Sequence, residues 1–95
     1  MTPPESPSEV AALVGQAVVL DLRSTYVCLG TLEAVDPLFF IVIDADLHDF
    51  RDSSASREVY VYDSKRLGIR RNRARVLVRR DEVVAIARFA DILAS

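Results

Sequence analysis

The sequence has one cysteine, one histidine and three glycines among 95 residues, so several classes of site are excluded at once. The lone Cys28 allows neither an internal disulfide nor a cysteine-based metal cluster, and we expect it to be a small apolar residue in a strand. The three glycines form no glycine-rich loop of the kind that cradles phosphates. No apolar run approaches the roughly 18 residues of a membrane-spanning helix, and no secretory signal is evident. We therefore expect a protein of the reducing cytoplasm that does not act at a membrane.

Catalysis and metal binding find little support in the residues present. His48 lies between Asp46 and Asp49, but a metal normally needs three or four convergent ligands, so we interpret His48 as a solvated residue in a mobile acidic loop. This loop also lacks the alternating oxygen ligands and the glycine of a calcium site. One histidine and one cysteine do not complete a nucleophilic triad or dyad. We expect no catalytic residue, no metal, no cofactor and no enzyme activity.

Charge is unevenly distributed along the chain, although the net charge is only −2. Residues 1–56 carry two arginines against nine acids, a net of −7, whereas residues 57–80 carry nine bases against two acids, a net of +7. Residues 81–95 return to −2. Such blocks favour either an anionic partner or pairing between neighbouring subunits.

The N-terminal third predicts a flexible lead-in, a short helix and two strands. Residues 1–7 hold three of the four prolines, and from Ser8 we expect a two-turn helix that ends at Gly15. Apolar and polar residues then alternate over 16–23, which is typical of a strand with one buried face. Residues 26–35 predict a second strand, in which Gly30 indicates a sharp bend or the close approach of another backbone.

Three further strands are expected after the turn at Pro37. The dense apolar run 38–43 predicts a third strand covered on both faces, and the acidic residues 44–56 are expected to leave the sheet. Residues 75–79 and 82–88 predict the fourth and fifth strands, joined by a tight turn at Arg80 and Asp81. Residues 89–95 form a short tail, with one helical turn or an edge contact.

The segment 56–67 is ambiguous between a helix and a strand. Residues 59–62 have strand propensity, but Ser56 is a suitable N-cap and Gly68 a natural stop. We favour the helix, within an insert that spans residues 44–74.

Five short strands without a second sheet bury a core only by curling over on themselves. The expected fold is therefore mainly β: an N-terminal helix followed by a five-stranded, strongly bent antiparallel SH3-like small barrel, over residues 8–88. Such a barrel leaves two free strand edges, which readily pair with other copies. Head-to-tail pairing closes into a ring where the rotation permits.

Two segments carry a resemblance to a known family. The first has the mid-strand Gly30, then Leu32, the pair Val35-Asp36 and the apolar strand Ile41-Val42-Ile43. The second is the apolar strand 76–78, followed by Arg79-Arg80-Asp81 and the apolar stretch 83–86. Together these segments resemble the Sm-like (LSm) family, of which the chain is identified as a divergent, bacterial-type member. The resemblance implies the Sm fold and a ring of five to seven identical subunits.

The resemblance also implies an RNA-binding pocket at the loops of the two motifs. By position, its residues are Asp36, Leu38, Phe40, Arg79, Arg80 and Asp81. Leu38 stands where the family has a planar group that stacks on the base, and Phe40 stands at the position that reads the base edge. Arg80 replaces a glycine. Phe40 either stacks on a base or, as we favour, packs in the core; Arg79 either binds RNA or forms a salt bridge between subunits near the pore.

A basic connection after the expected helix is a second candidate contact. It comprises Arg70, Arg71, Arg73 and Arg75, whose long side chains can reach phosphates. The alternative, which we favour, is a solvated face or pairing with the acids Asp44, Asp46, Asp49 and Asp52. The leading hypothesis is thus a ring-forming, RNA-associated protein with altered base selectivity, and the second is a homo-oligomeric scaffold that recruits a protein partner and does not bind RNA.

Overall fold

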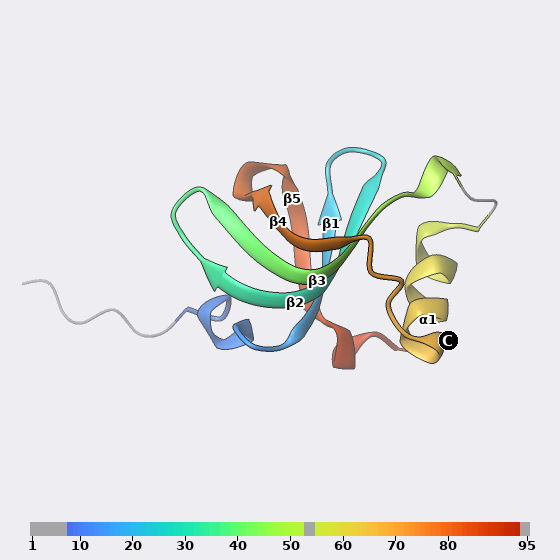
Figure 1. Ribbon diagram of the computed structural model, residues 1–95, viewed down its shortest axis with the longest axis horizontal. Coiled ribbons are helices and arrows are strands. Elements are labelled where there is room, and N and C mark those ends of the chain that lie inside the picture. The colour runs from blue at the N-terminus through green and yellow to red at the C-terminus, as the bar shows by residue number, and fades with distance from the viewer. Residues whose placement is uncertain (1–7, 53–54, 94–95) are drawn as a thin grey trace, which may run out of the picture.

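Five antiparallel strands form one strongly bent sheet in the computed structural model, which describes residues 8–52 and 55–93 (Figure 1). The strands are β1 (Ala17–Leu22), β2 (Tyr26–Val35), β3 (Phe39–Asp49), β4 (Arg73–Arg79) and β5 (Val83–Arg88). Their order across the sheet is β4-β3-β2-β1-β5, with every neighbouring pair antiparallel. The expected fold class, a mainly β chain with five strands in a bent sheet, is confirmed. The expected flexible lead-in, residues 1–7, lies outside the described residues.

Short helical segments connect the strands. One α-helix, α1 (Arg57–Leu67), lies between β3 and β4, and single 3-10 turns span Ala11–Leu13, Phe50–Asp52, Arg80–Glu82 and Phe89–Asp91. The two-turn helix expected from Ser8 is wrong in extent, since only the 3-10 turn forms. The Ser8 hydroxyl nevertheless accepts the backbone N–H of Ala11, and Gly15 has the positive φ of 88° expected of a stop. Gly15 also donates its N–H to the Leu32 carbonyl, so the chain has already turned into the sheet.

The helix predicted over 56–67 is confirmed, and the alternative strand over 59–62 is wrong. The Ser56 hydroxyl accepts the backbone N–H of Val59 at 3.3 Å, and Gly68 ends α1 with φ 99°. Because the side chain of Ser56 satisfies a donor that has no partner within the helix, the local chemistry outweighs the strand propensity of the valines and tyrosines. Within residues 8–52 and 55–93, no helix is long and apolar enough to cross a membrane.

Strand β3 is much longer than the sequence predicted. The acidic residues were expected to leave the sheet after Ile43, but β3 continues to Asp49 and pairs with β2 again from Asp46 to Asp49, after a shift in register. Asp44, at which the apolar residues of β3 give way to the acidic ones, has a positive φ of 49°. The expectation failed because Asp46 and Asp49 are buried side chains with their own hydrogen-bond partners, not solvated loop residues. In the apolar half of β3, only Phe40 and Val42 are buried. The prediction that both faces of this strand are covered is therefore only partly correct.

The core has two parts, one on each face of the bent sheet. The inner cluster contains Val18, Leu20, Leu22, Cys28, Leu32, Phe40, Val42, Ala45 and Val78. The second cluster contains Val19, Val27, Leu29 and Val61, the last of which comes from α1. Helix α1 therefore covers part of the outer face of the sheet. This cover explains why successive residues of β1 are buried where the alternation predicted one buried face.

Both edges of the sheet are free within the part of the chain that the structure describes. β4 pairs only with β3, and β5 pairs only with β1. Leu77 on β4 and Val84 on β5 are exposed apolar side chains at these edges. Unpaired edges with apolar side chains are surfaces on which another strand can add.

Candidate nucleic-acid interface and the polar cluster under the helix

The turn between β2 and β3 lies against the turn between β4 and β5. The Asp36 carboxylate accepts the backbone N–H groups of Leu38 and Phe39, at 2.8 and 2.7 Å, which holds the first turn. Arg80 donates its backbone N–H to the Leu38 carbonyl and its guanidinium to the Asp36 carbonyl, at 2.8 and 3.0 Å. The structure thus brings together the two segments in which the sequence placed the pocket.

The aromatic and aliphatic side chains at this end differ sharply in exposure. Phe40 is 5% exposed and belongs to the inner core cluster, and the Arg80 guanidinium lies 5.6 Å from the centre of its ring. Leu38 is 69% exposed and is aliphatic. The ring that could stack on a base is therefore almost fully covered, and the residue that faces solvent has no planar group.

Arg79 and Asp81 form an exposed ion pair, with 2.8 Å between the Arg79 Nη2 and Asp81 Oδ2 atoms. Exposed pairs of this kind contribute little to stability, about 0–1 kcal/mol. The guanidinium of Arg79 is therefore accessible to an anion that competes with Asp81.

Three of the four arginines of the basic connection each contact a different group. Arg71 lies 3.5 Å from Asp44, and Arg75 lies 3.4 Å from Glu33; both pairs are exposed. Arg73 donates to the neighbouring backbone carbonyl of Asn72. Of the four acids that the sequence offered as partners, only Asp44 pairs with this set among the described residues.

His48 is not in a mobile loop, which corrects the sequence interpretation. It lies on β3 opposite Val27, and its imidazole stacks on the ring of Tyr60, with 3.7 Å between the ring centres and an angle of 4° between the planes. Its Nε2 atom is buried and has no hydrogen-bond partner among the described residues. Within that same part of the chain, no group of three or more His, Cys, Asp or Glu residues could hold a metal.

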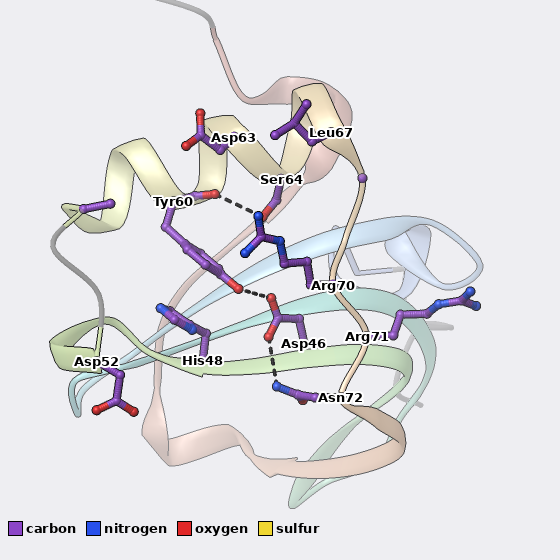
Figure 2. Close-up of a pocket in the computed structure, with 12 residues that line it drawn as sticks. Asp46, His48, Asp52, Tyr60, Asp63, Ser64, Leu67, Arg70, Arg71 and Asn72 are labelled. Atoms are coloured by element: carbon purple, nitrogen blue, oxygen red, sulfur yellow. Dashed lines mark hydrogen bonds between the residues drawn. The ribbon is translucent and has the colours of Figure 1, made fainter.

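A buried carboxylate lies beside this stack (Figure 2). Asp46 is 1% exposed, and its two oxygens accept hydrogen bonds from the Tyr60 hydroxyl and from the Asn72 amide, the latter at 3.1 Å. Asn72 also exchanges hydrogen bonds with the backbone of Leu47. Burial, and then the hydrogen bond to Asp46, raises the pKa of Tyr60 well above its usual range, and the charge of Arg70 partly opposes this. The cluster ties α1 and the start of β4 to β3.

Sequence reasoning missed this cluster of Asp46, Tyr60 and Asn72. One signal was present: Ala45 and Leu47 alternate with Asp46 and His48, which is the period of a strand. The partners of Asp46 lie 14 and 26 residues away, so nothing local indicated that its charge would be compensated.

A cavity of about 610 Å³ opens between α1 and β3, beside this cluster. Asp46 and His48 line it from β3, Tyr60 and Ser64 line it from α1, and Arg70 and Arg71 lie at the connection to β4. Figure 2 shows the Arg70 guanidinium between the helix and the Asp46 carboxylate.

Two further titratable groups have a structural role. Arg51 donates to both oxygens of Asp49, and this hydrogen bonding holds the pKa of Asp49 well below its usual range. Burial, and secondarily the charge of Asp46, raises the pKa of the Cys28 thiol to about 12. Cys28 is therefore a protonated apolar group in β2, as expected.

No family model matches the chain, and no curated protein matches it in sequence. Among solved structures, it is similar to the Sm protein of Pyrococcus abyssii, whose structure was determined in complex with a uridine heptamer. The TM-score is 0.59 at 20% sequence identity, over 88% of this chain and 99% of that chain. The similarity extends over nearly the whole of both chains, and at this identity it concerns the fold. The resemblance drawn from the two sequence motifs is thus confirmed at the level of architecture: this chain has the Sm-like fold.

Proposed function

We propose that this protein forms an Sm-like ring of identical subunits that binds RNA with weak base selectivity. The observation that carries the proposal is the meeting of the two turns, which puts Asp36 and Leu38 beside Arg80 and next to the Arg79–Asp81 pair. The similar Sm protein of Pyrococcus abyssii, seen with a uridine heptamer, supports RNA as the ligand class.

Ring assembly is supported by the two free sheet edges. β4 and β5 are the terminal strands of one sheet and lie at opposite ends of the strand order. Addition of β5 from one copy to β4 of the next continues the ladder, and repetition of this step closes a ring. We propose five to seven subunits.

Weak base selectivity follows from the side chains at the two turns. Leu38 offers no planar group, and Phe40 offers almost no exposed ring and no hydrogen bond to a base edge. Arg79 and Arg80 supply positive charge, which recognises the phosphate backbone regardless of sequence. Arg70, Arg71, Arg73 and Arg75 are proposed as additional phosphate contacts. We also propose that the protein is a divergent member of bacterial type and acts in the cytoplasm, without catalysis.

A second candidate function is a homo-oligomeric scaffold that binds a protein partner and no RNA. What favours it is the pairing of Arg79 with Asp81, together with a net charge of −2. An RNA that bound Arg79 would have to displace this ion pair, on a chain that is acidic overall, and both facts favour the scaffold.

Fluorescence anisotropy with short U-rich, A-rich and mixed RNAs separates these candidates. We expect binding at about 50 mM salt that weakens at about 200 mM, because phosphate contacts release counterions. Arg79→Ala should weaken binding of all three RNAs similarly, whereas Arg66→Ala on the exposed face of α1 serves as the charge-matched control. Binding that ignores Arg79→Ala would move the contact to the basic connection, and no binding at the lower salt would favour the scaffold.

A further inference from the structure

The outer face of the β3–β4 pair carries apolar side chains that belong to neither part of the core. Phe40 and Val42 point into the inner cluster, and successive side chains of a strand alternate between its two faces. Phe39, Ile41 and Ile43 therefore lie on the outer face. All three are partly exposed, and neither core cluster includes them.

Helix α1 covers a different part of the outer face. Its Val61 packs with Val19, Val27 and Leu29, which come from β1 and the first half of β2. In Figure 1, α1 lies at the opposite end of the molecule from the turn between β2 and β3, where Phe39 begins β3. The helix therefore leaves the Phe39 end of the outer face accessible.

Strand β4 adds arginines to this same face. The paired residues of the two strands are Phe39 with Arg79, Ile41 with Leu77, and Ile43 with Arg75. Residues directly opposite each other in an antiparallel pair share a face of the sheet. β4 contains three arginines and no acid. Arg75 and Arg79 are roughly 13 Å apart along the strand, so they can contact different phosphates of one extended nucleic-acid strand.

Two acids pair with these arginines and leave most of their donors free. Arg79 Nη2 lies 2.8 Å from Asp81 Oδ2, and Arg75 Nε lies 3.4 Å from Glu33 Oε1. Both pairs are exposed, and exposed pairs are weak. Because a guanidinium has several N–H donors in a planar fork, each arginine keeps donors that can reach a phosphate oxygen.

We propose that Phe39 stacks on a base of single-stranded RNA, and that Arg75 and Arg79 contact the flanking phosphates. An aromatic ring beside cations is the combination with which proteins bind single strands irrespective of sequence. This inference rests on the proposed function and names the ring that supplies the stacking, since Phe40 is buried in the core. A ring that stacks without reading a base edge is in keeping with weak base selectivity.

A tryptophan at position 39 tests the stacking directly. The chain contains no tryptophan, so Phe39→Trp introduces a single fluorescent reporter. We expect a short U-rich RNA to quench its fluorescence, because a stacked base contacts the indole ring. Tyr62→Trp, at an exposed aromatic residue of α1, is the control and should not be quenched. Circular dichroism checks that both variants are folded.

Either of two results would overturn the proposal: no quenching of Phe39→Trp, or equal quenching of both variants. A fluorescence change that follows protein concentration without RNA would assign this face to a contact between copies, and would overturn the proposal as well.

Phe39→Leu removes the planar ring and keeps an apolar side chain. We expect it to weaken binding of the U-rich RNA about tenfold, which is the size of one stacked base. Binding of an abasic strand of equal length should not change, because that strand offers phosphates and no base. Tyr62→Leu should affect neither ligand. An equal loss for both strands would contradict stacking at Phe39.

Arg79→Ala separates this inference from the proposed function. If Arg79→Ala weakens RNA binding and Phe39→Leu does not, the RNA-binding proposal stands and the stacking at Phe39 is wrong. If the wild-type protein binds no RNA, the proposed function fails, and this inference fails with it.

Discussion

At the scale of single residues, the buried carboxylate of Asp46 connects the helix to the sheet. It accepts the Tyr60 hydroxyl from α1 and the Asn72 amide from the segment before β4. Because these partners compensate a buried charge, each hydrogen bond should matter more than one at the surface.

Tyr60→Phe should therefore lower the free energy of unfolding by about 1.5–3 kcal/mol, the range for hydrogen bonds to charged groups. The matched control is Tyr62→Phe on the same helix, whose hydroxyl forms no hydrogen bond among the described residues and which is partly exposed. Urea denaturation monitored by circular dichroism measures both variants. Equal effects of the two changes would contradict a special role for the Tyr60–Asp46 bond.

Asp49 should make stability depend on pH in the acid range. Hydrogen bonds from Arg51 hold its pKa below the usual value, so its stabilisation is present above about pH 4 and is lost as pH falls through the lower folded-state pKa. Asp49→Asn removes the charge at every pH. The stability gap between wild type and Asp49→Asn should be widest near about pH 7 and should narrow as the pH falls from about 4 to about 2.5.

Urea denaturation at about pH 7, 4 and 2.5 measures this gap. Glu9→Gln, at an exposed residue that forms no hydrogen bond or ion pair among the described residues, is the charge-matched control. A gap for Asp49→Asn that stays constant with pH would contradict the assignment.

At the scale of elements, the bend of the sheet depends on the approach of β3 to β2 at Gly30. A Cβ atom at this position would lie 2.6 Å from Val42 Cγ1 and 2.9 Å from the Ile43 carbonyl oxygen. The register between β2 and β3 shifts at the same place. Because Gly30 has no side chain, the backbones of β2 and β3 can approach each other closely here, as the sequence predicted.

Gly30→Ala should destabilise the fold by about 1–3 kcal/mol, the cost of adding atoms where a backbone must move. The neighbouring Thr31→Ala removes atoms and creates no such overlap, so it serves as the control. Thermal denaturation of both variants measures the effect. A Gly30→Ala protein as stable as wild type would show that β2 and β3 are not in close contact here.

The elements also show where sequence reasoning reached its limit. Period-two alternation predicted the strand at 26–35 with its bounds, and the cap chemistry of Ser56 predicted α1. The second half of β3 was missed because its polar residues are stabilised by partners far along the chain, which no local pattern reveals. At the two turns, the motifs placed Asp36 and Arg80 in one region, and they do touch; their contact with RNA stays a prediction. The cluster under α1 depends on the long-range packing of three segments and was not predictable from the sequence.

At the scale of the whole molecule, the free edges of β4 and β5 determine what the chain can assemble into. Val84 on β5 is 69% exposed in the single chain, although it is apolar and lies on a strand. Strand addition would cover it with a neighbouring copy.

Val84→Asp should leave the subunit folded and break the assembly, because a carboxylate would be buried without a partner in the interface. Leu67→Asp at the end of α1, where Leu67 is 67% exposed, is the control and should preserve the assembly. Size-exclusion chromatography with light scattering compares them, and circular dichroism checks the fold. An unchanged mass for Val84→Asp would place the interface elsewhere.

Native mass spectrometry at micromolar concentration shows whether edge pairing closes identical subunits into a ring. We expect one dominant species of five to seven copies of the 10.6 kDa chain. A monomer at that concentration would rule out the proposed ring.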